Sequence, residues 1–386
     1  MNIEKIDLQE FHALISEWQI LLSESNTDSY FLTYEWLSVW IKHLGTNSTP
    51  YILIAKGSKA DDLLGAAPLV IEQTQNQIGL PIKKLGFMGN GSAEVDHLDF
   101  IIKKGFEDEV STAFVDYLQK QKDLWDILFL DGLVSSSPVL NVLSNSYHPG
   151  QFFVQTEPCP YLPLPENWES LRQSLSKNMR YNLGRYKRKL EKAHSGSIEF
   201  KRVENSQELN KVLPELYSSH HLLQQAKNGE NGIFEDSDIA DFHTELSSKA
   251  LISGQLRLYY LAIDDQVIAS LYCYKYKDSV LFYQTAYKLE WQMYSPGRLL
   301  MAHAIETSIA EGAREFDFLR GAETYKSSWT PCFRTEIKLH IACSTRGYLT
   351  LLPQFIRKKI KGLLNTESGL AVVRLINPGL AQRISH

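Results

Sequence analysis

The second half of the chain alternates between strand-like and helix-like patterns of apolar residues. Apolar and polar residues alternate over 197–203, which predicts a strand, and apolar residues then recur at helical spacing over 207–226 and 236–253. Turn-forming Asp264-Asp265 and Lys277-Asp278 separate three further strand-like runs. These runs, 256–263, 267–276 and 280–287, predict an antiparallel meander.

The segment after the meander predicts a crossover. Ser295-Pro296-Gly297 precedes an apolar-periodic stretch over 298–310, and Ser and Pro are favoured at the start of a helix. A short strand, a short helix and another strand are then expected at 315–319, 323–329 and 335–342. Because a strand–helix–strand crossover makes its two strands parallel, strands 280–287 and 315–319 should run parallel and splay around the start of the helix.

The first half gives the same order more faintly. Its expected strands are 2–6, 51–56, 63–71, 82–87, 125–130 and 152–155, and its expected helices are 8–23, 34–44, 107–121 and 138–145. The strand after the long helix reads alike in both halves, as Phe129-Leu130-Asp131-Gly132 and Phe318-Leu319-Arg320-Gly321. This similarity predicts an internal repeat, with two unrelated α/β domains as the alternative. The expected domains are 1–160 and 161–345, followed by a tail at 346–386.

Composition and charge narrow the function classes. A chain of 386 residues accommodates two or three domains, and 44% hydrophobic with 22% charged residues is typical of a globular protein rather than a disordered or coiled-coil one. The 40 Lys and Arg residues against 45 Asp and Glu residues give a net charge of -5. A protein that coats nucleic acid is normally basic, so no DNA partner is expected.

The chain shows no obvious export or membrane-spanning signal. The first residues lack the apolar core of a signal peptide, and no apolar run reaches the roughly 18 residues that span a bilayer, so a cytoplasmic location is expected. The four cysteines are scattered, which favours reduced thiols over a disulfide or zinc site. Segment 348–364 predicts a basic amphipathic helix that either lies on the inner membrane surface or packs on the domain.

Several second-half motifs resemble a known family. They are Gly254-Gln255-Leu256-Arg257-Leu258, Tyr294-Ser295-Pro296-Gly297 with Leu299-Leu300 and Ala304-Ile305-Glu306, and Phe316-Asp317-Phe318 with Gly321, Tyr325-Lys326 and Trp329. Their order over roughly 165–345 resembles the CelD/BcsL-type (BioF2-like) acetyltransferases of the GNAT superfamily, relatives of the FemAB ligases. The first half resembles the companion domain less specifically, through Phe31-x-x-Tyr34-Glu35-Trp36-Leu37 and Asp96-His97-Leu98-Asp99.

The resemblance implies a fold and an activity. The implied fold is α/β, with two tandem GNAT-like domains, each a mixed sheet flanked by helices. The implied activity is N-acyl transfer, with acetyl as the first expectation, from a thioester donor to an amine on a sugar, an amino acid or a polysaccharide or envelope precursor. Two alternatives stay open: FemAB-like aminoacyl transfer from tRNA, and a non-catalytic scaffold in exopolysaccharide assembly. Loop 227–235 is too short for the helical hairpin of many such ligases, so tRNA is not the expected partner.

The resemblance also implies a donor site at the start of helix 298–310. In the GNAT fold the donor's pantetheine lies between the splayed strands, and its pyrophosphate meets free N–H groups at the following helix start. Here those positions are Ser295, Gly297, Arg298 and Leu299, with acyl-CoA or acyl carrier protein as the donor. The usual Q/R-x-x-G-x-G/A signature is absent, which leaves the donor open and a plain helix start as the alternative. No ligands at metal spacing stand nearby, so no metal is expected.

Three residues are candidates for the chemistry. Asp317 is mid-strand, with its side chain opposite to those of its phenylalanine neighbours, so it is either a general base or a structural partner of Arg320 or Lys326. Tyr325 could protonate the leaving thiolate, and Lys326 could stabilise the oxyanion or hold an acceptor phosphate. The alternative for both is a solvated helix face.

The remaining candidates concern the acceptor. The resemblance places His220 at the cleft, and Tyr283, Gly321 and Trp329 are assigned to the same substrate site, although Trp329 also fits a core position. Helix 171–193 has one apolar stripe and an opposite face rich in Lys and Arg. Arg180 and Arg185 on this helix match a family motif and would suit a phosphorylated or lipid-linked acceptor; the alternative is a solvated basic face.

Overall fold

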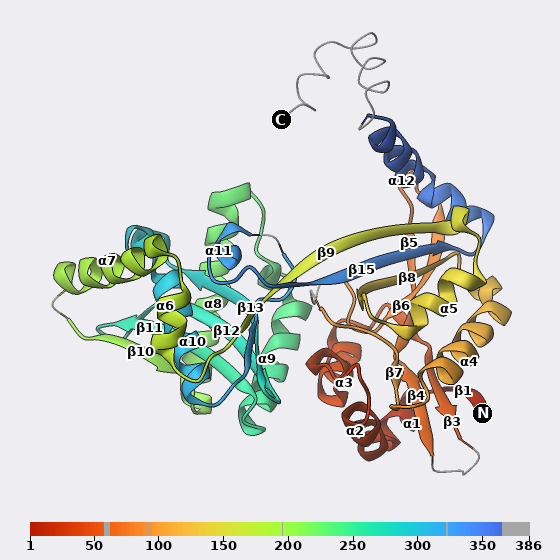
Figure 1. The fold of residues 1–386 in the computed structure, drawn as a ribbon, viewed down its shortest axis with the longest axis horizontal. Helices are drawn as coiled ribbons and strands as arrows, with labels where there is room; N and C mark the ends of the chain where they lie inside the picture. Colours follow the sequence, from red (N-terminus) through yellow and green to blue (C-terminus); the bar gives the residue numbers. More distant parts are fainter. Residues whose placement is uncertain (58–61, 92, 94, 195, 322, 365–386) are drawn as a thin grey trace, which may run out of the picture.

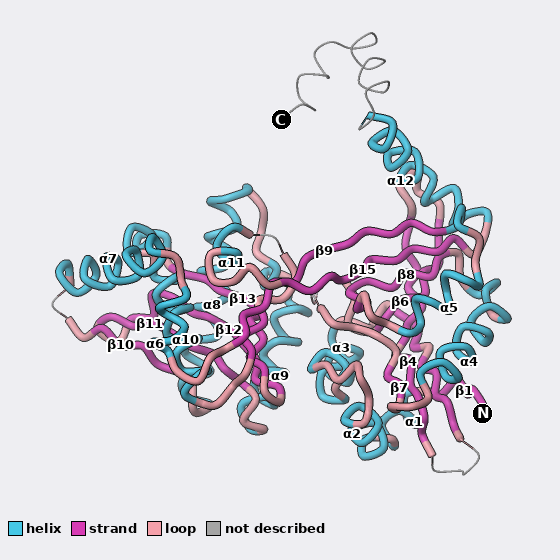
Figure 2. Tube along the Cα trace, viewed as in Figure 1, coloured by secondary structure: helices cyan, strands magenta, loops and turns pink. Residues whose placement is uncertain are grey.

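Two α/β halves lie side by side in the protein, joined by two long strands (Figure 1). The computed structural model describes residues 1–57, 62–91, 93, 95–194, 196–321 and 323–364. The joining strands are β9 (Phe152–Pro163) and β15 (Phe333–Ala342), which run antiparallel to each other. Figure 2 shows both strands extending from one half into the other.

The N-terminal half contains a small sheet and part of a large one. Its strands are β1 (Asn2–Ile6), β2 (Ser48–Pro50), β3 (Ile52–Lys56), β4 (Leu63–Ala67), β5 (Leu69–Gln75), β6 (Pro81–Phe87), β7 (Ile101–Ile102) and β8 (Ile127–Val134). Its helices are α1 (Leu8–Ala13), α2 (Ile15–Ser23), α3 (Tyr34–His43), α4 (Glu107–Lys120) and α5 (Pro138–Ser146), with short 3-10 turns η1 (Tyr30–Leu32), η2 (Lys122–Leu124) and η3 (Pro149–Gln151). The small sheet has the order β1-β3-β4-β7.

The C-terminal half is built on the expected meander. Its strands are β10 (Ile198–Arg202), β11 (Leu256–Ile263), β12 (Gln266–Tyr276), β13 (Ser279–Tyr287) and β14 (Glu315–Asp317). Its helices are α6 (Trp168–Ser174), α7 (Lys177–Ala193), α8 (Ser206–Asn228), α9 (Ser237–Ile252), α10 (Pro296–Ala310) and α11 (Thr324–Ser327), with 3-10 turns η4 (Ile233–Glu235) and η5 (Leu289–Tyr294). These elements confirm the expected order of strands and helices.

One eleven-stranded sheet passes through both halves in the order β10-β11-β12-β13-β14-β9-β15-β8-β6-β5-β2. Strand β15 falls inside the range 161–345, yet it pairs with β8 of the N-terminal half as well as with β9. Strand β9 runs on to Pro163, where it pairs with β14. The domain limits 1–160 and 161–345 stay a prediction, but the hydrogen-bonded sheet does not stop at residue 160.

The crossover expected from sequence is present. Strands β13 and β14 are parallel, and α10 connects them. They pair at only three positions, from Ser279 with Glu315 to Leu281 with Asp317. Beyond these positions β13 continues for six residues, Phe282 to Tyr287, without β14 beside it. The expected divergence of these strands therefore occurs.

Three expected elements are interrupted. The helix expected at 8–23 is two helices, α1 and α2, because the chain leaves helical geometry at Leu14. The strand expected at 63–71 divides at Pro68, which has no N–H to donate to a ladder. The basic helix expected at 171–193 is α6 and α7, and Ser176 caps α7 by accepting from the Met179 N–H.

Helix α12 (Thr345–Leu364) begins on the N-terminal half and leaves the body of the molecule (Figure 1). Leu351 is buried with Ile82, Ile127 and Ala342, so the first turns pack on the sheet. The side chains of the predicted basic segment from Arg357 onward, and all of 365–386, lie outside the described residues. Among the described helices, none is both long and apolar enough to span a bilayer.

Candidate active site

A cavity of about 400 Å³ opens where β13 and β14 separate. Its walls come from the free part of β13, the segment after β14, α11, and loops and strands of the N-terminal half. The lining residues are Gly91, Asp96, Asp131, Glu157, Phe282, Tyr283, Gln284, Phe318, Leu319, Arg320, Glu323, Tyr325, Lys326 and Lys338. This volume is in the range of small-molecule sites. Both halves of the chain therefore build it.

Two predicted catalytic residues, Tyr325 and Lys326, line this cavity. Burial, and to a lesser degree the nearby Glu323 carboxylate, raises the pKa of Tyr325, so its hydroxyl carries a proton at neutral pH. Its ring packs edge-on against that of Phe282, with the ring centres 6.4 Å apart. The side chain of Tyr325 can thus act as a proton donor.

Lys326 is 4% exposed, so the alternative of a solvated helix face is wrong for this residue. Its Nζ donates to the Arg320 carbonyl at 2.6 Å and lies 3.0 Å from Glu323 Oε2. These two contacts leave one of its three N–H groups for another partner. Lys326 therefore holds the turn between β14 and α11 and keeps a positive charge at the cavity wall.

The predicted base, Asp317, does not line this cavity. It is 1% exposed, and its Oδ2 accepts from His97 Nε2 at 3.0 Å and from Arg334 Nη1 at 2.7 Å, while Oδ1 accepts from the Leu319 N–H. Its partners are therefore neither Arg320 nor Lys326. Burial opposes the charge, but His97 and then Arg334 lower the pKa of Asp317. A carboxylate with both oxygens engaged and a lowered pKa is a poor base, so a structural role fits Asp317, with His97 and Arg334 as partners in place of those expected.

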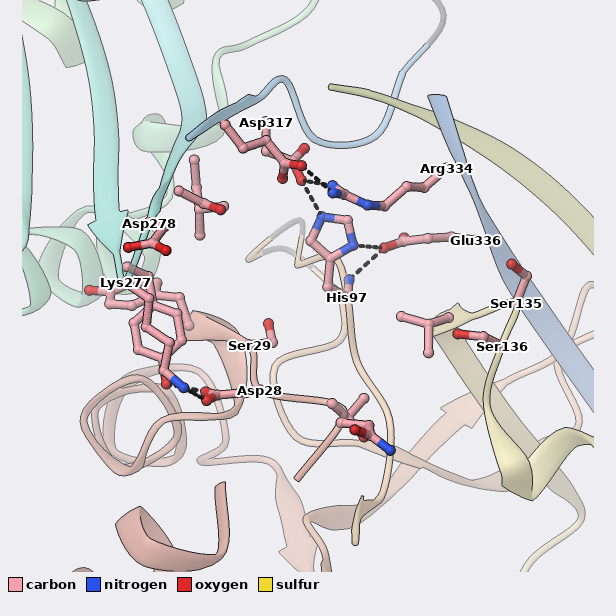
Figure 3. A pocket seen from close by; sticks show the side chains of 18 of the residues that line it. Asp28, Ser29, His97, Ser135, Ser136, Lys277, Asp278, Asp317, Arg334 and Glu336 are labelled. Carbon is pink, nitrogen blue, oxygen red and sulfur yellow. Dashed lines mark hydrogen bonds and ion pairs between the residues drawn. The ribbon is translucent and has the colours of Figure 1, made fainter. Parts of the chain in front are cut away.

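His97 joins Asp317 to the N-terminal half. Its Nδ1 lies 2.7 Å from Glu336 Oε1, so the ring stands between two carboxylates (Figure 3). Burial opposes the charged ring, but Asp317 and Glu336 raise the pKa of His97 well above its ordinary value. This ion network forms part of the wall of a second cavity, about 770 Å³, between the two halves. The cavity at β13 and β14 and this second cavity thus lie on different sides of the same network.

Arg320 makes the corresponding connection on the side of the first cavity. Its Nε donates to Asp96 Oδ1 at 2.7 Å, its backbone N–H to Asp96 Oδ2 at 2.7 Å, and its Nη1 to Asp131 Oδ1 at 2.6 Å. Asp131 and Arg320 occupy the same place in the two similar sequence motifs, so the repeated motifs contact each other. Burial and then the Glu336 carboxylate raise the pKa of Asp96 to about 7.

The sequence predicted only three of the lining residues, Tyr283, Tyr325 and Lys326, and it missed the charged residues Asp96, Glu157 and Lys338 among others. Asp96 was visible as part of the Asp96-His97 motif, but its partner Arg320 is more than 200 residues away, and nothing local reveals the contact. Glu157 and Lys338 come from β9 and β15, which the sequence assigned to separate halves. Glu157 is only loosely paired, at 3.6 Å from Arg320 and 3.7 Å from Lys338.

The predicted donor-binding residues lie at the start of α10, but most of their backbone N–H groups already donate to carbonyls of the chain. The N–H groups of Arg298 and Leu299 lie 3.1 and 3.2 Å from the carbonyl of Ser295, which has a left-handed backbone with φ of 49°. The side chain of Leu299 is buried in the core. Gly297 stands against β13, where an added Cβ would lie 3.5 Å from the Tyr287 ring. The N–H of Ser295 is engaged as well, since it donates to the Gln292 carbonyl at 3.0 Å, and the assignment of these positions to the donor stays a prediction.

The basic helix α7 lies beside this helix start rather than beside the cavity. Hydrogen bonds to Ser295 and then to Arg185 lower the pKa of Tyr186, and Lys189 Nζ donates to the Met293 carbonyl at 3.3 Å. Arg180 is used locally, because its Nη1 donates to the Gln173 and Leu175 carbonyls at 2.7 and 2.9 Å. Of the two predicted acceptor-binding arginines, Arg185 is at the start of α10 and Arg180 stabilises the turn between α6 and α7.

Of the other predicted acceptor residues, Tyr283 lines the cavity and His220 does not. Tyr283 lines the cavity, and its hydroxyl donates to the Ala93 carbonyl and lies 3.1 Å from His243 Nε2. His220 is 3% exposed and packs edge-on against Phe234; it is not among the lining residues, and burial lowers its pKa to about 4.

Gly321 and Trp329 have structural roles. Gly321 has a φ of 124°, and an added Cβ would lie 2.3 Å from Glu323 Oε2, so only glycine fits this turn. Trp329 is 5% exposed and belongs to the core of the C-terminal half.

One group of potential metal ligands lies behind the cavity. Asp96, Cys159 and Glu336 have ligand atoms within 4.8 Å of one another. The Arg320 guanidinium already donates to Asp96, and burial raises the pKa of the Cys159 thiol, so the thiolate form is disfavoured. These residues are therefore accounted for by the ion network, and no step of the chemistry is assigned to a metal there.

Comparisons with known proteins agree with this architecture. Residues 177–327 match the family model described as an acetyltransferase (GNAT) domain. A search of curated protein sequences finds no significant match. Among solved structures, FemX superposes with a TM-score of 0.59 and 11% identity, covering 89% of this chain and 98% of FemX.

Two further structures are similar over most of their length. The C-terminal domain of a putative lysylphosphatidylglycerol synthetase from Agrobacterium fabrum has a TM-score of 0.52 and 9% identity, covering 90% of this chain and 96% of that one. A tandem GNAT protein from the clavulanic acid biosynthesis pathway has a TM-score of 0.50 and 9% identity, covering 89% and 98%. The expected tandem GNAT-like α/β fold is thereby confirmed, and residues 177–327 are similar to an acetyltransferase domain of the GNAT type.

Proposed function

We propose that this protein moves an acyl group from a thioester donor to an amine, and that the transfer takes place in the cavity between β13 and β14. The observation that carries the proposal is the open divergence of these two parallel strands, directly before the start of α10. The GNAT family match over the same segment supports it. Acetyl is the first donor group to test, on coenzyme A or on acyl carrier protein.

The residues of the cavity suggest a division of labour. The amine nitrogen forms a bond to the thioester carbon, the carbon–sulfur bond breaks, the amine loses a proton and the thiolate gains one. Tyr325, which is protonated at neutral pH, supplies the proton to the thiolate. The free N–H of Lys326 stabilises the developing oxyanion. Glu157 takes the proton of the amine, because its two ion pairs are both longer than 3.5 Å and leave its oxygens accessible.

The charges of the cavity favour a cationic acceptor. Four carboxylates, of Asp96, Asp131, Glu157 and Glu323, stand against the three cations Arg320, Lys326 and Lys338. An ammonium group gains from the two partly exposed carboxylates, Glu157 and Glu323, before it is deprotonated. An amino sugar, an amino acid or an amine on a polysaccharide precursor fits this chemistry, in line with the CelD/BcsL-type resemblance.

The test is an assay of thiol release. Purified protein is incubated with acetyl-CoA and a panel of amino sugars and amino acids, and Tyr325→Phe is compared with Tyr181→Phe, a matched change on the exposed face of α7. Loss of a general acid should lower kcat by about 100-fold in Tyr325→Phe and leave Tyr181→Phe unchanged. Full activity of Tyr325→Phe would remove the acid role. The absence of thiol release with both acetyl-CoA and acetylated carrier protein would contradict the function.

A second candidate is aminoacyl transfer from tRNA, which the exposed basic face of α7 favours. The connection between α8 and α9 is short, since α8 ends at Asn228 and α9 begins at Ser237, and this weighs against it. Ribonuclease treatment distinguishes the two: transfer from a charged tRNA is abolished, whereas transfer from acetyl-CoA continues. A non-catalytic scaffold would show neither transfer nor a thermal shift with acetyl-CoA.

The location of the protein can be tested separately. A basic tail from residue 348 would recruit the protein to an anionic membrane surface from the cytoplasmic side. Sedimentation with phosphatidylglycerol vesicles, with and without residues 346–386, measures this recruitment, and equal sedimentation of both forms would contradict it.

A further inference from the structure

We propose that the outer face of α7 docks an acidic carrier protein, which delivers the acyl donor on a phosphopantetheine arm to the start of α10. The inference rests on the proposed acyl transfer and specifies the class of its donor. It begins from a concentration of positive charge in a chain whose net charge is -5. Figure 1 shows α7 at the outer edge of the C-terminal half, where a partner has access.

The cations of α7 are exposed and lack acidic partners. The exposed set is Lys177, Arg185, Lys187, Arg188, Lys189 and Lys192, and Glu191 is the only acidic residue of the helix. Among the residues that the structure describes, none of these six lies within ion-pair distance of a carboxylate. Within the described ranges, some exposed cations elsewhere find one, such as Arg172 with Glu169, and others, such as Lys120, do not, but α7 carries six unpaired cations on one helix. The uncompensated charge on α7 is therefore available to a partner.

The apolar side of α7, opposite its basic face, packs on the C-terminal half and holds the helix in place. Met179 and Leu190 are buried in the core of the C-terminal half, and Leu183 and Tyr186 pack against it. Lys189 and Tyr186 reach η5 and Ser295, so one edge of the basic face borders the start of α10. From the start of α10, the part of β13 that is not paired with β14 runs from Tyr287 back to Phe282 at the cavity. At 3.3 Å per residue, the length of strand between these two residues is about 17 Å. A phosphopantetheine arm is an extended chain of comparable reach.

The composition of the face favours an acidic protein over a bilayer or an RNA. A helix that lies on a membrane presents apolar side chains to it, but the apolar stripe of α7 is buried, and Tyr181, 61% exposed, is the large apolar side chain left on the outer face. The helix is about 26 Å long, which matches the length of one helix of a partner protein. Arginine and tyrosine are frequent at the centres of protein interfaces.

The experiment compares two donors with the full-length protein. Arg188→Glu with Lys192→Glu reverses two exposed charges in the C-terminal part of α7, and Lys120→Glu with Lys122→Glu is the matched reversal on the N-terminal half. Acetylated acyl carrier protein and acetyl-CoA are each used as donor, and binding of fluorescently labelled carrier is measured at low and moderate salt. We expect the α7 reversal to lower kcat/KM for the carrier at least tenfold, and to leave kcat/KM for acetyl-CoA within about twofold of the parent.

The outcomes separate this inference from the proposed function. Transfer from acetyl-CoA with no binding of the carrier, or with carrier binding unaffected by the α7 reversal, overturns the docking surface and leaves the function intact. Failure of both donors overturns the function, and the docking surface is then judged by carrier binding alone. Binding of tRNA or of phosphatidylglycerol vesicles that depends on α7, without carrier binding, assigns the face to another partner and overturns the inference. Weakening of carrier binding by added salt in the parent supports it.

Discussion

The two halves of the molecule contain the same pair of diverging parallel strands, but only one pair remains open. In the N-terminal half, β6 and β8 pair at three positions, from Lys84 with Ile127 to Gly86 with Phe129, as β13 and β14 do in the other half. Beyond these positions residues 95–99 enter the gap: the Leu98 N–H donates to the Gly132 carbonyl at 2.8 Å, and Leu98 is fully buried. The gap between β6 and β8 is therefore filled by core residues, whereas the gap between β13 and β14 is a cavity.

The segment that fills the first gap also supports the second. Asp96 accepts from Arg320 at the cavity, and His97 bonds Asp317 on the other side of the network. In the C-terminal half the space between the diverging strands is left open and forms the cavity. In the N-terminal half the chain fills the corresponding space, and the filling segment supports the cavity.

The largest effect is expected where the two halves meet. Arg320→Ala leaves the buried Asp96 carboxylate without its main partner and should lower the free energy of unfolding by about 3–5 kcal/mol, measured by urea denaturation. Arg314→Ala is the control, because Arg314 is 84% exposed and its ion pair with Asp278 is long, so its loss should be within about 0.5 kcal/mol. Similar small losses in both variants would show that the ion network does not hold the halves together.

Creating space in the filled gap between β6 and β8 should lower the free energy of unfolding somewhat less than Arg320→Ala does. Leu98→Ala removes a fully buried side chain and should lower the unfolding free energy by about 3 kcal/mol, with Ile20→Ala, at a side chain 57% exposed, as the control. Because the C-terminal cavity is the proposed site, acetyl-CoA should still raise the melting temperature of Leu98→Ala. Loss of that shift together with unchanged stability would reverse the roles of the two gaps.

Filling the open gap should affect activity more than stability. Gln284→Trp places a large ring in the cavity and should lower kcat/KM by about 100-fold, or about 2.7 kcal/mol of transition-state free energy. Lys83→Trp adds the same ring at an exposed position of β6 and should leave kcat/KM unchanged. Equal kcat/KM in the two variants would place the reaction outside the cavity.

The smallest expected effect is a pH dependence of stability. The raised pKa of His97 contributes stability that is fully present below its unfolded pKa, about 6.5, and is lost as pH rises through its higher folded value. Asp96, with its pKa raised to about 7, changes stability in the same direction, because the folded state binds its proton more tightly. Urea midpoints should therefore fall from about pH 5.5 to about pH 8. His97→Gln should flatten this slope, and an unchanged slope would exclude His97 as its source.

Local patterns predicted most of the elements but only part of the site. The meander, the helix after Ser295-Pro296-Gly297 and the parallel pair of strands follow from apolar periodicity and turn residues, which act over a few positions. Tyr325 and Lys326, predicted from the family resemblance and from their position on the short helix after the crossover, both line the cavity. The base role of Asp317 stays a prediction. Its partners, His97 and Arg334, could not be predicted, because strand alternation gives the direction of a side chain without its neighbours.

Residues close together in the chain set the periodicity of each element, the repeated order of elements and the motif that marks the second crossover, so these features can be predicted without a structure. Three features are visible only in the folded molecule: β15 joins the N-terminal sheet, Arg320 contacts Asp96 and Asp131, and one gap is filled while the other is open. Such contacts form when helices and sheets pack against each other. The free energy of packing depends on which side chains meet, and the periodicity of a single element does not identify them.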